Sequence, residues 1–241
     1  MRYAVLSDVH GNLEALEAVL ADAAAHADAV VCLGDVVGYG ADPVPCVERL
    51  AERAQAVVAG NHEHGVTGLL DLAWFNNSAR AAAMWTRRRL DEDQRAWLGT
   101  RPLVHVIEDA TLVHASPANP EEWEYLISAD DGYEAFGAFA TRVCFVGHSH
   151  RPGAWSIGSS GPAHEPSATD TVLERGRRYV INVGSVGQPR DHDARAAYAV
   201  WSTDEHHVTI RRVPYDVATA REKILAAGLP TFLADRLSIG A

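Results

Sequence analysis

Histidine, aspartate and asparagine side chains recur in five short motifs along this 241-residue chain. The motifs are Asp8-x-His10, Gly34-Asp35-x-x-Gly38, Gly60-Asn61-His62-Glu63, His114 and Gly147-His148-Ser149-His150. Their imidazole nitrogens, carboxylate oxygens and amide oxygen suit Mn, Fe, Zn, Co or Ni better than Mg or Ca. Each motif alone is a weak signal, but the five together predict one metal-dependent centre.

An apolar run precedes each motif, which indicates that strands position these side chains. The runs cover residues 2–7, 29–33, 54–59, 111–114 and 143–146. In an open α/β sheet the carboxyl ends of the strands form the ligand crevice. Glycines accompany four of the five motifs and allow sharp turns and close backbone approach. Helical periodicity over 13–26, with a further helix over 43–53, completes a strand–loop–helix repetition, typical of a layered α/β fold.

Residues 68–98 differ in character and predict helices that form a small cap beside the centre. Their aromatic residues Trp74, Phe75 and Trp85 fit either a substrate lid or a dimer face, and periodicity does not separate these two. A homo-oligomer therefore stays open.

The remainder of the chain is predicted to be mostly strands, with residues 216–237 helical and broken at Gly228 and Pro230. The predicted strands are 103–107, 111–114, 143–146, 154–157, 172–174, 179–183, 197–202 and 207–213. Residues 117–140 are predicted as a loop and a helix, and 158–170 as a loop rich in Gly, Ser and Pro. No linker is visible, so we expect a single domain over residues 1–241.

Composition limits the classes of partner. Hydrophobic residues make up 47% of the chain, enough for a full core, and no apolar run is long enough to span a membrane. The net charge of −11 disfavours binding of long nucleic acids. Cys32, Cys46 and Cys144 have no metal-ligand spacing, and Cys32 and Cys144 are expected to be buried. Because this cysteine usage suits a reducing compartment, we expect a cytoplasmic protein.

In their order and spacing the five motifs resemble the calcineurin-like metallophosphoesterases, over about residues 1–213. Residues 8–12 and 181–191 resemble the small bacterial phosphodiesterase branch in particular. The family implies a four-layer αββα sandwich with its site at the sheet edges. It also implies a metal-dependent hydrolase of phosphate esters.

The resemblance distributes the predicted ligands over two divalent transition metal ions, with manganese expected first and Fe, Ni, Co or Zn as alternatives. One ion would take Asp8, His10 and His150, and the other Asn61, His114 and His148. Asp35 would bridge them. Two divalent ions carry four positive charges, and two aspartates with a bridging hydroxide carry three negative charges. The net charge of about +1 attracts phosphate. Such a pair also generates hydroxide at neutral pH. His62 would act on the leaving group as general acid or charge stabiliser.

The second motif departs from one branch of the family. Phosphoprotein phosphatases carry G-D-x-x-D-R-G, whereas here the run is Gly34-Asp35-Val36-Val37-Gly38-Tyr39-Gly40. The missing Arg argues against a protein phosphatase and against a symmetrical diadenosine tetraphosphate hydrolase. Asn12, Arg190 and Tyr39 are the candidates for substrate binding. Arg190 could equally form a surface turn with Asp191, and Tyr39 could equally pack against the cap.

The leading prediction is a phosphodiesterase for a small, nucleotide-like substrate. A dinucleoside polyphosphate or nucleotide pyrophosphohydrolase is the alternative. A nuclease fits poorly with the acidic charge. A non-catalytic scaffold would show replaced ligands, and here every ligand position and His62 are filled.

Overall fold

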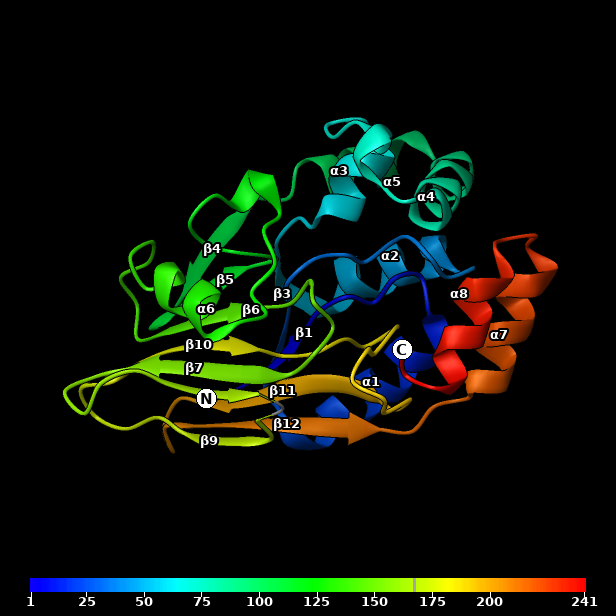
Figure 1. The fold of residues 1–241 in the computed structure, drawn as a ribbon. Helices are drawn as coiled ribbons and strands as arrows, with labels where there is room; N and C mark the ends of the chain where they lie inside the picture. Colours follow the sequence, from blue (N-terminus) through cyan, green and yellow to red (C-terminus); the bar gives the residue numbers. More distant parts are fainter. Residues whose placement is uncertain (167) are drawn as a thin grey trace.

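The computed structural model describes residues 1–166 and 168–241, and it contains two mixed sheets that face each other (Figure 1). The strands of the first sheet are, in spatial order, β3 (Ala54–Val57), β2 (Ala29–Cys32), β1 (Arg2–Leu6), β11 (Ala196–Ser202), β12 (His207–Val213) and β9 (Asp170–Val172). Those of the second sheet are β4 (Val104–Ile107), β5 (Ala110–Val113), β6 (Val143–Val146), β10 (Arg178–Asn182), β7 (Gly153–Ile157) and β8 (Ala163–Pro166).

The strands that precede the motifs are parallel to their neighbours. β1, β2 and β3 run in parallel in the first sheet, and β5, β6 and β10 do so in the second. Parallel strands end at one edge, so the polar loops that follow them are brought together.

Alternate residues of β1 face two different cores. Tyr3 and Val5 point into the core between the sheets, whereas Ala4 and Leu6 point into the core under the helices. This two-residue period explains why a short strand buried on both faces is apolar throughout.

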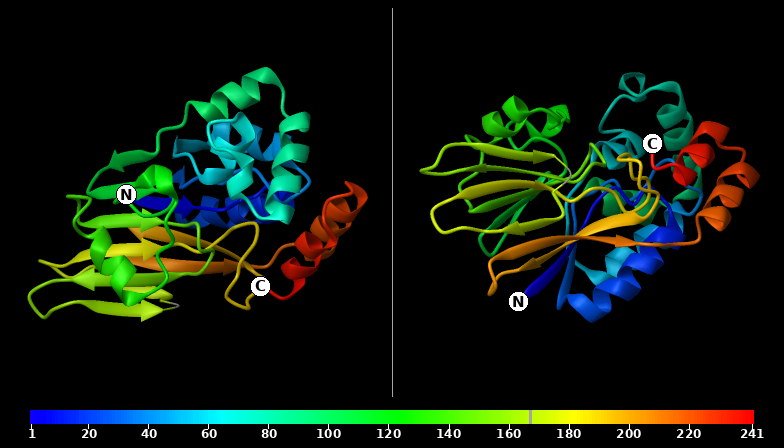
Figure 2. Two further views of the ribbon diagram at one scale, coloured as in Figure 1. Left: turned by 45° about the horizontal axis from the view of Figure 1, so that its top comes forward. Right: turned by 60° about the horizontal axis from the view of Figure 1, so that its bottom comes forward.

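Helices cover the outer face of each sheet. On the first sheet, α1 (Leu13–His26) packs against β11 and β12, with α2 (Pro43–Arg53) beside it. On the second, α6 (Ala129–Ala135) packs against β7 and β8. The predicted αββα sandwich is therefore confirmed (Figure 2).

Two further groups of helices lie at one end of the sandwich (Figure 1). The first is the segment predicted as a cap, which contains a 3-10 turn (Leu72–Trp74), α4 (Asn77–Arg89) and α5 (Glu92–Gly99). The second is C-terminal and contains α7 (Val217–Ala226), α8 (Thr231–Asp235) and a 3-10 turn (Arg236–Ser238). Ala79 and Ala82 of α4 share one apolar cluster with Ile224 and Leu233 of the second group.

Two local predictions differ from the structure, and one helix was not predicted. Residues after β3 form a helix, α3 (Asn61–Thr67), because the Glu63 carboxylate accepts the Gly60 N–H and closes the first turn. The predicted loop 158–170 contains β8, which pairs with the edge strand β7, while its residue 167 lies outside the described residues. β9 begins at Asp170 rather than 172, since its partner β12 sets the register.

All three cysteines are buried and unpaired, as expected for Cys32 and Cys144. Across residues 1–166 and 168–241, the helices are all too short or too polar for a membrane-spanning segment.

Candidate metal centre

The five predicted motifs converge at the carboxyl edges of both sheets. Their side chains form three overlapping groups in which the potential ligand atoms all lie within 4.8 Å of one another. The groups are Asp8 with His10 and His150, His10 with Asp35 and His62, and Asp35 with His114 and His148. All seven side chains are buried. Residues as far apart in the chain as Asp8 and His150 therefore form one compact cluster.

Asp35 occupies the middle of this cluster. Its Oδ2 lies 3.6 Å from His10 Nε2 and 3.3 Å from His114 Nε2. On one side, His10 Nε2 is 3.1 Å from His150 Nε2, and on the other His114 Nε2 is 3.1 Å from His148 Nδ1. The shared carboxylate therefore lies between two pairs of imidazoles.

Main-chain carbonyls fix the orientation of three of the imidazoles. The Nδ1 atoms of His10, His114 and His150 lie 3.1, 2.9 and 2.6 Å from the carbonyl oxygens of Val37, Leu33 and Gln188. An Nδ1–H that donates to a carbonyl leaves Nε2 unprotonated and aimed into the centre, as metal ligation requires.

Two oxygen atoms of the predicted metal ligands are buried without a hydrogen-bond partner in the described structure. They are Oδ1 of Asp8 and Oδ1 of Asn61. A buried polar oxygen of this kind is costly unless a cation or a donor satisfies it. The donor set of imidazole nitrogens, carboxylates and one amide oxygen therefore fits divalent transition metals.

Burial and mutual charge set the protonation of the cluster. Burial lowers the pKa of His148 to about 3 and holds the pKa values of His10 and His150 well below their usual range. Burial raises the pKa of Asp35, but the charges of His114, His62 and His10 and a hydrogen bond from His114 together outweigh this effect and hold that pKa well below its usual value. Neutral imidazoles and an ionised carboxylate are the protonation states that bind a metal. His114 differs from the other three imidazoles, because the neighbouring carboxylates, with Asp35 foremost, outweigh the effect of burial and raise its pKa to about 9, so it would lose a proton on binding a metal.

Six residues of the centre have a left-handed backbone. The φ angles are 54° at Asp8, 52° at His10, 50° at Asp35, 52° at Tyr39, 64° at His148 and 61° at His150. L-residues adopt this region at a cost, and such outliers concentrate at functional sites. The sharp turns aim side chains from the ends of strands toward a common point.

A buried glutamate that was not assigned a role from the sequence supports these turns. The carboxylate of Glu63 accepts the backbone N–H groups of Asp35, Val37 and Gly60 at 2.6, 3.2 and 2.8 Å. Glu63 thereby ties the second motif to the third. Its presence in the third motif was visible in the sequence, but two of its partners, Asp35 and Val37, come from a loop 26 or more positions away.

His62 lies against the metal cluster and the cap. Its ring centroid is 4.7 Å from that of His10, 4.6 Å from that of Tyr39 and 5.0 Å from that of Phe75. The Nδ1 atom is buried without a partner in the described structure. A Cβ added to Gly38 would lie 2.1 Å from this Nδ1, so only glycine leaves room for the ring.

The three predicted substrate-binding residues have different surroundings. Asn12 caps α1, where its Oδ1 accepts from Ala15 N at 3.1 Å, and its Nδ2 donates to Gly187 O at 2.8 Å. Both polar atoms are engaged, so a contact between Asn12 and substrate stays a prediction. Tyr39 is buried with its ring 4.4 Å from that of His10, while Arg190 lies 5.7 Å from the Tyr39 ring.

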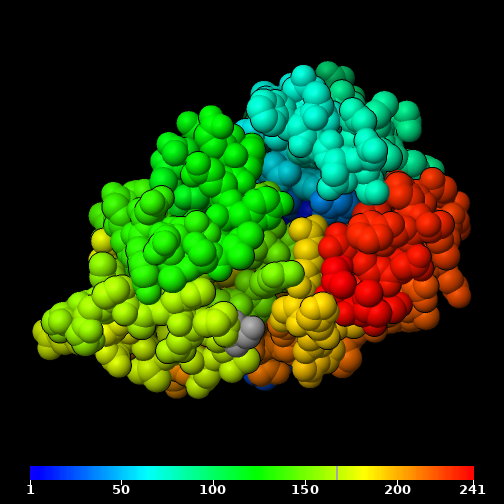
Figure 3. All heavy atoms as spheres, in the orientation of Figure 1, coloured from blue at the N-terminus to red at the C-terminus, as the bar shows by residue number. Residues whose placement is uncertain are grey.

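A cleft of about 510 Å³ opens beside the metal cluster. Arg190 lines it together with Tyr125, whose ring stacks on that of His148 at 4.0 Å. Figure 3 also shows a hollow where the green lobe, the cyan helices and the red C-terminal segment meet, whereas the described residues that line the cleft include none of the cyan helices or the red segment. Tyr125 was not found from the sequence, since it lies in a loop that carries no motif.

The fold and this cluster define a metal-binding hydrolase of phosphate esters. The chain belongs to the calcineurin-like phosphoesterase superfamily, whose domain model matches residues 1–206. A metallophosphoesterase from Sphaerobacter thermophilus is 41% identical, with a TM-score of 0.87 over 100% of this chain and 99% of that one.

Two archaeal proteins are also similar over nearly their whole length. An uncharacterized protein of Methanocaldococcus jannaschii is 39% identical over 98% of this chain and 97% of its own. A hypothetical protein from Pyrococcus horikoshii shares the fold, with a TM-score of 0.78 and 20% identity over 100% of this chain and 98% of its own.

Proposed function

We propose that the chain is a phosphodiesterase that uses two divalent metal ions and acts on a small substrate. One ion would be held by Asp8, His10 and His150, and the other by Asn61, His114 and His148. Asp35 would bridge the two ions. The observation that carries this proposal is the place of Asp35 Oδ2, within 3.6 Å of one imidazole and 3.3 Å of another from the two separate sets.

The chain's own residues would position and polarise the ester. When bound, two divalent ions lower the pKa of a water shared between them and stabilise the charge on the phosphate. Asp8 and Asp35 return two negative charges, so the site stays net positive and attracts an anion. His62, with one ring nitrogen unpartnered in the described structure, would donate to the departing oxygen.

Each finer assignment has one observation that supports it. Manganese is the metal we propose first, because the ligands are imidazoles and oxygens without a thiolate. The cytoplasm is the proposed location, since three buried cysteines remain unpaired. Residues 68–98 are proposed as a cap on a single domain, because Phe75 packs on the His62 ring. The net charge of −11 favours a small substrate over a long nucleic acid.

Metal reconstitution tests the proposal directly. Metal-stripped protein would be assayed with bis(4-nitrophenyl) phosphate and 4-nitrophenyl phosphate after separate addition of Mn, Ni, Co, Zn and Mg. We expect turnover of the diester to exceed that of the monoester, and Mn or Ni to restore it best. Binding of two ions per chain without turnover of either ester would refute the phosphodiesterase assignment.

A further inference from the structure

A second arginine lies beside Arg190, and it comes from a segment beyond residue 206, where the family model ends. Gln188 Oε1 accepts hydrogen bonds from Arg190 Nη2 and from Arg236 Nη1, both at 2.9 Å. The Gln188 side chain is 1% exposed. Two guanidinium groups from distant parts of the chain therefore converge on one buried amide oxygen.

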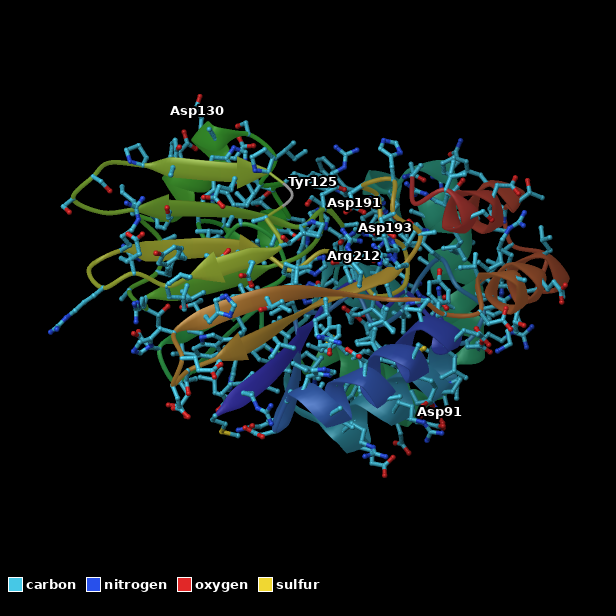
Figure 4. All side chains as sticks on the ribbon, turned by 90° about the horizontal axis from the view of Figure 1, so that it is seen from below. Asp91, Tyr125, Asp130, Asp191, Asp193 and Arg212 are labelled. Carbon is cyan, nitrogen blue, oxygen red and sulfur yellow. The ribbon has the colours of Figure 1, made fainter. Side chains whose placement is uncertain are left out.

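Neither arginine forms a salt bridge with an Asp or Glu side chain within residues 1–166 and 168–241, although Arg236 Nε donates a hydrogen bond to the main-chain oxygen of Ala241. The carboxylates near them in the sequence form salt bridges with other arginines: Asp191 with Arg212, Asp193 with Arg195 and Asp235 with Arg221. Figure 4 shows Asp191 and Asp193 beside Arg212. The turn formed by Arg190 with Asp191 is therefore no ion pair, and the Arg190 Nε is buried without a partner in the described structure.

No Asp or Glu side chain of the described residues compensates the positive charge of the two arginines. Burial and the neighbouring charge of Arg190 lower the pKa of Arg236 to about 10, so the group is still a cation at neutral pH. Like charges held together in a partly buried place destabilise the fold unless an anion binds between them. Arginine forks match the geometry of phosphate oxygens.

The pair adjoins the metal centre through Gln188. The main-chain oxygen of Gln188 lies 2.6 Å from His150 Nδ1, and Arg190 N donates to the His150 carbonyl at 3.2 Å. Arg190 also lines the cleft of about 510 Å³, and the C-terminal segment that carries Arg236 forms a wall of the hollow in Figure 3. Arg190 therefore lies between the metal centre and the cleft, and Arg236 adjoins it through the shared Gln188.

We propose that Arg190 and Arg236 bind a second phosphate group next to the phosphate that is cleaved. This inference rests on the proposed two-metal function, because its charge count includes the ions. Two ions, two aspartates and a hydroxide leave about one positive charge, which a phosphodiester monoanion neutralises. Two arginines add two more, which match the charge of a further phosphate. The substrate class is a phosphate ester that contains a phosphoanhydride, and Arg236 determines this specificity.

Calorimetric binding to the manganese-loaded full chain tests the inference without turnover. The probes are inorganic phosphate and methylenediphosphonate, a non-hydrolysable analogue of pyrophosphate, and the measured quantity is the ratio of their dissociation constants. We expect Arg236→Met to lower the preference for the diphosphonate by about tenfold or more. The matched control Arg221→Met removes an arginine already paired with Asp235 and should leave the ratio within about twofold.

A second variant separates charge from packing. Leu237→Ala loosens the same segment, since Leu237 is buried, but it retains both guanidinium groups. We expect the preference for the diphosphonate to persist in Leu237→Ala. An equal fall in Leu237→Ala, or equal weakening of both probes in Arg236→Met, would overturn the inference.

The two proposals fail in different ways. An unchanged ratio in Arg236→Met, in a protein that hydrolyses the aryl diester, would overturn the second-phosphate site alone. A weaker preference for the diphosphonate in Arg236→Met, in a protein without hydrolytic activity, would support the anion site and refute the phosphodiesterase.

Discussion

Replacement of Asp35 by asparagine isolates the charge of the shared ligand. Asp35 Oδ1 accepts the backbone N–H of His62 at 2.9 Å, and an asparagine oxygen can retain this bond. The other oxygen lies between His10 and His114 and would lose its negative charge. The variant should therefore fold like the wild type while lacking the carboxylate between the two sets of ligands.

The expected loss can be estimated from electrostatics. At an effective dielectric constant of about 20, two unit charges about 4 Å apart interact by about 4 kcal/mol. The double charge of a divalent ion doubles this interaction energy. Water that replaces the carboxylate compensates for part of the loss, so we expect each ion to lose about 4 kcal/mol of binding free energy. This energy corresponds to roughly a thousandfold in each metal dissociation constant. Because Asp35 would contact both ions, both affinities should fall together.

Metal stoichiometry and turnover provide the assay. Protein dialysed against a fixed low concentration of Mn²⁺ would be analysed for bound metal and then for hydrolysis of bis(4-nitrophenyl) phosphate. Asp8→Asn is the matched control, because Asp8 belongs to one ligand group in the structure whereas Asp35 belongs to two. We expect loss of one ion in Asp8→Asn and of both in Asp35→Asn. Retention of two ions with wild-type turnover in Asp35→Asn would refute the bridging role.

Three further predictions concern the leaving group, the glycine beside it and a distant ion pair. His62→Ala should keep both ions but lose about 10²–10⁴-fold in kcat, most for poor leaving groups; equal losses for 4-nitrophenyl and alkyl leaving groups would contradict a proton donor. Gly38→Ala should lower kcat by about tenfold or more with metal retained, since its Cβ would displace the His62 ring; wild-type kcat would show that the ring position is irrelevant. Hydrogen bonds from Arg211 and Tyr198 hold the pKa of Asp22 below its usual value, despite partial burial. The ionised Asp22 therefore stabilises the folded state above about pH 4, and this contribution is lost as the pH falls through the lowered pKa. Asp22→Asn should cost about 1–3 kcal/mol of unfolding free energy at pH 7 and less at about pH 3, measured by urea denaturation; an equal cost at both pH values would exclude the ion pair.

The metal cluster could be predicted from the sequence because its ligands lie in short local motifs. Asp8 and His10 lie two positions apart after one strand, and His148 and His150 repeat the arrangement after another. Parallel pairing then brings the ends of these strands to one edge. Fold class and ligand convergence both follow from this combination.

Other features depend on contacts that no local pattern encodes. Arg236 reaches Gln188 only because α7 and α8 pack against the end of the sandwich, and nothing near Arg236 marks it as a binding residue. The helix α3 depends on a carboxylate that also serves two other backbone amides. The strand β8 lies in a segment rich in turn residues and is held by its pairing with β7.

The left-handed backbone of the ligand residues has an evolutionary consequence. Glycine would adopt these conformations without strain, so each of these aspartates and histidines costs of the order of 1 kcal/mol relative to glycine. Selection for hydrolysis therefore maintains residues that selection for folding would discard. A lineage released from the need for catalysis would gain stability by drifting toward glycine at these turns. Among diverged relatives, glycine at the positions of Asp8, His10 or Asp35 would then be an early sign that the chemistry has been abandoned while the sandwich persists.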